Sequence, residues 1–189
     1  ACKELEKIEQ LVDGTLNNTA RMLDSMGAVE YRFIYNDLSK IIQSAGQNVF
    51  FPDNIRLILD ETTGHSRFGH YDKYHLEKAL INILNNAVEA IVQSGKEEGY
   101  VRVEMVSFFH WVVIVISDNG TGISRSVRRK LFMPHYSNKN GKLNWGLGLA
   151  YVYKIVKAHF GQIKINSHYG EYTSFLIMLP FKGKEGRND

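Results

Sequence analysis

The chain has 189 residues, of which 44% are hydrophobic and 23% charged, so composition predicts one globular domain or a domain with a helical attachment. The net charge of +3 is too small to indicate a nucleic-acid partner, and we expect none. The single cysteine, Cys2, excludes an internal disulfide and favours a reducing compartment. No apolar run could cross a bilayer and no signal peptide is visible, so we expect a cytoplasmic location, with any membrane anchor outside this sequence.

Residues 1–27 predict a helix that needs a partner. A near-heptad stripe is typical of paired helices, and here it consists of Leu5, Ile8, Val12, Leu16, Thr19, Leu23 and Met26. A homodimer through this helix is one expectation, and the alternative is a helix that packs on its own domain. Residues 28–182 would form the main domain, and residues 183–189 a charged tail.

The main domain alternates strand and helix patterns. We expect strands at 30–35, 55–59, 67–70, 100–109, 111–117, 162–167 and 173–179. Helices are expected at 38–45, 75–91, 124–131 and 147–159, with Asp37 and Asp72 as N-caps of the first two. The sum predicts an α+β fold, a two-layer α/β sandwich in which helices cover one face of a mixed sheet.

The helix expected at 75–91 carries two different rows of side chains. Its apolar row is Leu76, Leu80, Ile83, Leu84, Ala87 and Ile91. Asn82, Asn86 and Glu89 share another face of the same helix. A buried carboxamide must find hydrogen bonds, so this polar row indicates a ligand; the alternative is a solvated outer face.

Five motifs follow one another in the order and spacing of a known family. They are NILNNA at 82–87, DNGTGI at 118–123, FMPHYSNK at 132–139, GLGL at 146–149 and GEYTSF at 170–175. These resemble the N, G1, F and G2 boxes, and the run before the last strand, of the ATP-binding domain of sensor histidine kinases. The resemblance covers roughly residues 55–180 and implies the Bergerat type of ATP-binding fold, with ATP and Mg²⁺ as ligands.

The resemblance assigns Asp118 to adenine recognition, with Thr173 as a neighbour reached partly through water. A carboxylate can accept a hydrogen bond from the exocyclic amine of adenine, whereas guanine presents a carbonyl there. Gly120 and Gly122 would let the backbone approach the base or adopt positive φ. A hairpin turn at 119–120 is the alternative, but the residues from 124 onward have helical character.

Two further residues, Ala90 and Ile123, are expected beside the nucleotide. Asn86 resembles the asparagine whose side-chain oxygen coordinates Mg²⁺, an ion that prefers oxygen ligands. Asn82 stands where hydrolytic relatives carry a water-activating Glu, and a carboxamide cannot take a proton, which argues against fast hydrolysis. Glu89 stands where many histidine kinases have Lys, so its contact with the phosphates is open.

Residues 133–145 are expected to form the ATP lid, rich in Asn, Gly and Lys. Lys139 would meet the phosphates as a point charge, with a plain solvated loop as the alternative. His135 and Tyr136 fall where the family often has a second Phe and would also line the nucleotide.

The GLGL motif opens the helix expected at 147–159. Backbone amides at Gly146, Leu147, Gly148 and Leu149 would hold the triphosphate. Asn144 replaces the first glycine of the usual family pattern, and the bulky Trp145 follows it. Asn tolerates left-handed conformations, so the turn can persist.

The resemblance implies a protein-histidine kinase that would present the γ-phosphate of ATP to a His on a dimerisation hairpin, for relay to a response regulator. Asn82, Asn86 and Lys139 would be its catalytic residues, and residues 1–27 resemble the second helix of that hairpin. None of the seven histidines starts an acceptor pattern, so we expect the acceptor outside this sequence. The alternatives are a hydrolytic ATPase of the same fold, a non-catalytic binding or scaffold module, and a serine kinase of the anti-sigma type.

Overall fold

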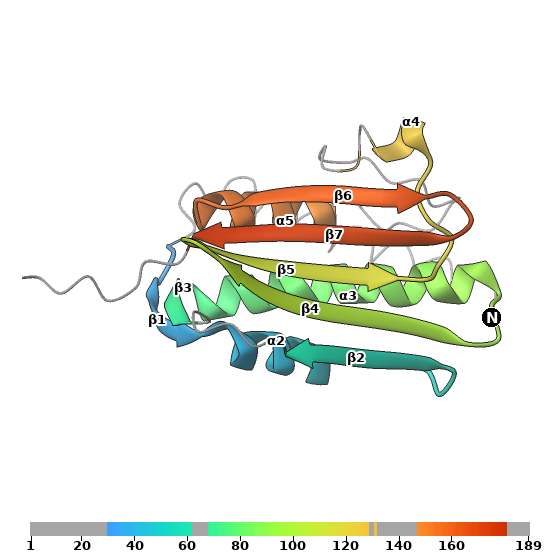
Figure 1. Cartoon of the computed structure of the whole chain (residues 1–189), viewed down its shortest axis with the longest axis horizontal. Helices are drawn as coiled ribbons and strands as arrows, with labels where there is room; N and C mark the ends of the chain where they lie inside the picture. The colour runs from blue at the N-terminus through green and yellow to red at the C-terminus, as the bar shows by residue number, and fades with distance from the viewer. Residues whose placement is uncertain (1–29, 62–67, 129–130, 132–146, 181–189) are drawn as a thin grey trace, which may run out of the picture. The chain divides into compact units, whose positions relative to one another are not determined.

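The computed structural model describes residues 30–61, 68–128, 131 and 147–180 (Figure 1). The helices and strands in this part all belong to one compact unit. The helix expected at 1–27 and the tail expected at 183–189 lie outside the described residues.

A mixed five-stranded sheet has the strand order β2-β4-β5-β7-β6. Its strands are β2 (Ile55–Glu61), β4 (Gly99–Phe108), β5 (Trp111–Asp118), β6 (Gln162–His168) and β7 (Tyr172–Pro180). Strand β2 runs parallel to β4, and the other neighbours are antiparallel. A separate antiparallel pair joins β1 (Ile34–Asp37) to β3 (Phe68–Tyr71).

Helices α2 (Leu38–Gln47), α3 (Lys73–Ser94) and α5 (Leu147–Ala158) lie on one side of the five-stranded sheet (Figure 1). Along β5, Val112, Ile114 and Ile116 are buried while the residues between them are half-buried. This alternation is typical of a sheet that packs on helices by one face only. The predicted two-layer α+β sandwich is therefore confirmed.

Helix α3 is the longest helix of the described part and begins and ends at clear signals. The Asp72 carboxylate accepts a hydrogen bond from the His75 backbone N–H at 2.9 Å, and Gly95 ends the helix at φ 66°. The buried face contains every apolar residue expected there, with Ala79 in addition. The predicted core face and N-cap are confirmed, and the helix extends slightly beyond residues 75–91 at both ends.

Two expected elements differ from the structure. Residues 30–33 are not a strand, and the strand is Ile34–Asp37 instead. The Arg32 N–H donates to the Asp72 carboxylate at 2.7 Å, so it is not available for hydrogen bonds to a neighbouring strand. The helix expected at 124–131 is the short α4 (Arg125–Arg128) in the described part. None of the helices described here is long and apolar enough to cross a bilayer.

Candidate functional site

The glycine-rich loop after β5 lies directly on helix α3. The Thr121 N–H donates to the Ala90 carbonyl oxygen at 3.1 Å. A Cβ atom added at Gly120 would lie 2.6 Å from the Ala90 carbonyl carbon, closer than real Cβ atoms approach. Gly120 is therefore required because there is no space for a side chain, and not because of a positive φ. Ala90 lies beside the loop, and its expected place beside the nucleotide stays a prediction.

Asp118, the last residue of β5, and Thr173, near the start of β7, form one buried polar pair. They are opposite residues in the pairing of β5 with β7, and their side chains are 3% and 2% exposed. Opposite residues on neighbouring strands carry their side chains on the same face, with Cβ atoms about 5 Å apart. The Asp118 carboxylate and the Thr173 hydroxyl therefore lie together on the side of the sheet that faces the helices.

Burial raises the pKa of Asp118 to about 6, although the Gly120 N–H and the nearby Lys96 ammonium each favour the charged form. The Gly120 N–H donates to Oδ1 of this carboxylate at 2.9 Å. At neutral pH the side chain is therefore mostly ionised, removed from water and able to accept further hydrogen bonds. These are the properties of an acceptor for an amine donor on a ligand.

Lys96 is a site residue that sequence reasoning missed. Its ammonium donates to the backbone oxygen of Asn119 at 2.5 Å and to that of Glu171 at 3.3 Å. It thereby ties the end of α3 to the loop after β5 and to the β6–β7 hairpin. A lysine between two glycines in a turn looks like a solvated surface residue, so the sequence carries no signal for this role.

Gly122 has the positive φ that the sequence analysis allowed for. Its φ is 63°, and a Cβ atom there would collide with the His168 carbonyl oxygen. The Gly170 N–H donates to the Thr121 carbonyl oxygen at 2.7 Å. The loop after β5 is therefore bound to the β6–β7 hairpin on one side and to α3 on the other.

Ser167 is a second residue that sequence reasoning missed. Its hydroxyl oxygen accepts from the Ile123 N–H at 2.8 Å and lies 3.2 Å from the Thr173 hydroxyl oxygen. It also donates to the Tyr172 carbonyl oxygen at 2.7 Å. Ser167 holds Ile123 close to the Asp118–Thr173 pair, and an isolated serine in a strand gives no sequence signal for this.

The other end of the site is the contact between α3 and the first turn of α5. A Cβ atom added at Gly148 would lie 3.1 Å from Oδ1 of Asn82. The Asn82 amide group donates to the Lys78 carbonyl oxygen at 3.0 Å, which fixes the side-chain orientation. The amides of residues 147–149, which have no acceptor within the helix, therefore begin beside Asn82, where an anion would be stabilised.

Asn86 lies on α3 one turn after Asn82 and one turn before Ala90. The eight residues from Asn82 to Ala90 span about 12 Å along the helix axis. Asn86 and Glu89 are both half-buried. Within the described residues the Asn86 carboxamide makes no hydrogen bond, so its oxygen is available to a ligand or a metal ion. Helix α3 thus connects the buried Asp118 end of the site to the Gly148 end.

His135, Tyr136, Lys139 and Gly146 lie outside the described residues, as do the other residues of the expected lid at 133–145. Leu147 and Leu149 are placed as residues of the first turn of α5. The expectations for the lid therefore stay predictions.

A known protein family and several known proteins resemble this chain. The family model described as histidine kinase-, DNA gyrase B-, and HSP90-like ATPase matches residues 71–183, more than half of the chain. Sporulation kinase B of Bacillus subtilis (strain 168) is 33% identical over 146 residues, which are 76% of this chain and 33% of that protein. The signal transduction histidine-protein kinase AtoS of Escherichia coli (strain K12) is 28% identical over 179 residues, which are 94% of this chain and 28% of that protein.

The fold is also that of a solved structure, the catalytic domain of histidine kinase ThkA. The TM-score is 0.64 at 23% identity, over 79% of this chain and 95% of that one. The chain spans about a third of the length of the two sequence relatives. The chain belongs to the histidine kinase-, DNA gyrase B-, and HSP90-like ATPase family.

Proposed function

We propose that this chain is the catalytic ATP-binding part of a sensor histidine kinase. It binds Mg·ATP and transfers the γ-phosphoryl group to a histidine on a dimerisation hairpin, for relay to the receiver domain of a response regulator in the cytoplasm. The observation that carries the proposal is the placement of the buried Asp118–Thr173 pair and of the Gly148–Asn82 contact along one helix, α3. Family membership and the named relatives support it.

The base would bind at the Asp118 end. The carboxylate accepts from the exocyclic amine of adenine, and the carbonyl of guanine in the same place would be repelled. Thr173 adds a hydroxyl beside it, directly or through water. Gly120, Gly122, Ile123 and Ala90 would line the site, because the loop that carries the first three follows Asp118 directly and is hydrogen-bonded to the Ala90 carbonyl oxygen.

The phosphates would bind at the Gly148 end. Asn86 offers a carboxamide oxygen without a partner among the described residues, which suits Mg²⁺, with Glu89 on the same face. Magnesium would supply charge neutralisation when bound. Asn82, the amides at 146–149 and Lys139 would orient and neutralise the triphosphate, so that catalysis is mainly positioning.

Two rival functions make different predictions. A hydrolytic ATPase needs a base near the attacking water, and the carboxamide of Asn82 cannot serve as one. Vigorous phosphate release in a multiple-turnover assay without any acceptor would favour that rival. A non-catalytic scaffold would gain no thermal protection from Mg·ATP.

The test of the site uses two substitutions and a matched control in the 189-residue chain. Asp118→Asn and Asn86→Asp are each expected to abolish calorimetric ATP binding. Asn85→Asp adds the same charge at the exposed neighbour of Asn86 and should bind ATP as the unaltered chain does. Unchanged affinity in both site variants would refute the site. Labelling with Mg·[γ-³²P]ATP and candidate hairpin fragments then identifies the acceptor histidine.

A further inference from the structure

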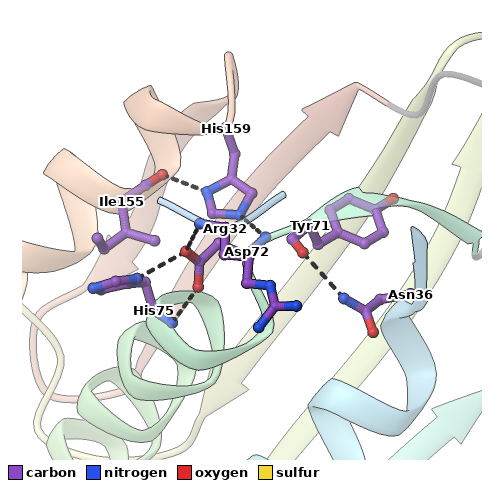
Figure 2. Close-up of polar contacts among 7 residues, drawn as sticks. All are labelled: Arg32, Asn36, Tyr71, Asp72, His75, Ile155 and His159. Atoms are coloured by element: carbon purple, nitrogen blue, oxygen red, sulfur yellow. Dashed lines mark hydrogen bonds and ion pairs between the residues drawn. The ribbon is translucent and has the colours of Figure 1, made fainter. Parts of the chain in front are cut away.

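A buried histidine joins the two helices of the proposed nucleotide site at the end far from the phosphates. His159 follows α5 and is 4% exposed. Its Nδ1 lies 2.8 Å from the Ile155 carbonyl oxygen, and its Nε2 lies 3.0 Å from the Asp72 backbone nitrogen (Figure 2). A carbonyl oxygen can only accept and an N–H can only donate, so Nδ1 carries the proton, Nε2 is bare and the ring is neutral.

Helices α3 and α5 pack on each other in antiparallel orientation, and two places mark their register. Asp72 immediately precedes α3 and contacts His159 after the end of α5, while Asn82 contacts Gly148 in the first turn of α5. The two contacts are ten residues apart on α3, about 15 Å of helix. Together with the apolar packing between the helices, the His159 bond to Asp72 therefore helps to fix how far α5 reaches along α3, and with it the place of the α5 amides beside Asn82.

We propose that neutral His159 is a positioning residue for nucleotide binding, which holds α5 in the register on α3 that places Gly148 beside Asn82. This inference rests on the proposed function. When the register is released, only a fraction of the molecules has both ends of the phosphate site in place. The apparent affinity for nucleotide then falls by that fraction.

Protonation of His159 would release this register. A second ring proton would sit on Nε2 and face the Asp72 N–H, so that two donors meet and the hydrogen bond is lost. In the described part of the chain, the other polar groups around the ring are the Asp72 carboxylate, His75, the Tyr71 phenol and the Arg32 backbone (Figure 2). The carboxylate is already engaged, by the N–H groups of Arg32 and His75 and by the His75 ring 2.9 Å away.

The same surroundings keep the ring neutral at ordinary pH. Burial lowers the pKa of His159, and the charge of Asp72 offsets this only in part. The Phe33 ring packs on the imidazole at 5.0 Å between centroids, which helps to keep water away. Acidification below the ordinary range of histidine is therefore required to break the contact.

A matched pair of substitutions separates the two hydrogen bonds of His159. Glutamine places a carboxamide oxygen near the position of Nε2, so H159Q keeps an acceptor for the Asp72 N–H. Asparagine places its amide near Nδ1, so H159N keeps only the bond to Ile155. Neither side chain titrates.

Calorimetry with Mg·AMP-PNP, at a temperature where circular dichroism shows every variant folded, tests the inference. Near pH 7.5 we expect H159Q to bind within about threefold of the unaltered chain and H159N to bind about tenfold more weakly. Near pH 5, below the ordinary range of histidine, the unaltered chain should lose more affinity than H159Q. Protonation of Asp118 is common to both, so the ratio between them isolates His159. The ¹⁵N signals of the ring in the ligand-free chain should show the Nδ1–H tautomer.

Three results would overturn the inference. They are equal affinity of H159N and the unaltered chain, equal weakness of H159Q and H159N, and a ring that carries its proton on Nε2. Each of them leaves the proposed function intact if the unaltered chain binds AMP-PNP. Absence of binding by the unaltered chain at every pH would overturn the proposed function, and this inference with it.

Discussion

The Asp118 carboxylate faces the Thr173 hydroxyl across β5 and β7, and both groups are almost completely removed from water. A charge in such a place costs stability, since burial raises the pKa of Asp118 to about 6. Charges retained at a stability cost are typical of functional sites. A substitution in this pair should therefore raise the stability of the fold and weaken ligand binding at the same time.

Asp118→Asn should abolish calorimetric ATP binding and stabilise the fold. The amide loses the charge-assisted hydrogen bond, while the cost of a buried charge at pH 7.5 is relieved, worth about 1–3 kcal/mol in the free energy of unfolding. Calorimetry and urea denaturation measure the two effects. The control is Asp60→Asn, at an exposed residue whose Oδ2 lies 3.5 Å from Nε of Arg102. This substitution should change the free energy of unfolding by less than about 1 kcal/mol. A less stable variant with unchanged affinity would contradict the assignment.

Gly120→Ala should destabilise the fold by about 1–3 kcal/mol and weaken ATP binding, because the new methyl group meets the backbone of Ala90. Gly95→Ala is the comparison: Gly95 has φ 66° and nothing within 4 Å of a Cβ atom, so only backbone strain of about 1 kcal/mol is expected there. Chemical denaturation gives the stabilities. If both variants bind ATP equally well, the close approach of Gly120 to α3 does not matter for the site.

Lys96→Met should raise the pKa of Asp118 further, because the ammonium of Lys96 favours the ionised carboxylate. The pH at which ATP affinity is half lost should therefore move upward, while Lys96→Arg, which keeps the charge, should move it much less. Carbon-13 titration of the Asp118 carboxyl in the ligand-free chain reports the pKa directly. A carboxyl pKa that does not change in Lys96→Met would show that the two groups are not coupled.

The pH dependence of stability should contain two opposing contributions. His159 has a lowered pKa, so the unfolded chain binds more protons and acidification below about pH 6.5 destabilises the fold. Asp118 has a raised pKa of about 6, so the folded chain binds more protons between that value and the ordinary one near 3.8, and acidification there stabilises it.

Removal of Asp118 and removal of His159 should therefore change the slope of stability against pH in opposite directions. Asp118→Asn should lose stability more steeply than the unaltered chain between about pH 6 and pH 4, and H159Q should lose it less steeply below about pH 6.5. Urea denaturation over a pH series measures both slopes. Identical slopes in all three proteins would contradict the burial argument.

Local signals in the sequence predicted most of the elements correctly. Asp37 and Asp72 cap helices as expected, and the apolar row of α3 is buried, because capping and helical periodicity depend on neighbours within a few residues. The first four residues of the strand expected at 30–35 were assigned wrongly, because the Arg32 N–H donates to a carboxylate 40 positions away; residues 34 and 35 do belong to β1. A hydrogen bond to a residue so distant in the sequence cannot be predicted from the neighbouring residues alone.

The sequence by itself determined the family, the two-layer fold and the order of the motifs around 82, 118 and 148, because motif spacing and periodicity are properties of the chain alone. Only the tertiary structure decided which groups meet. Gly120 approaches the backbone of Ala90, and Gly148 lies beside Asn82. Lys96 donates to the backbone of two separate loops, and His159 accepts from the Asp72 N–H. Lysine, serine and histidine also occur on solvated surfaces, so the residue type alone does not reveal these roles. Their roles here come from burial and from hydrogen bonds between distant segments, which exist only once the helices have packed on the sheet.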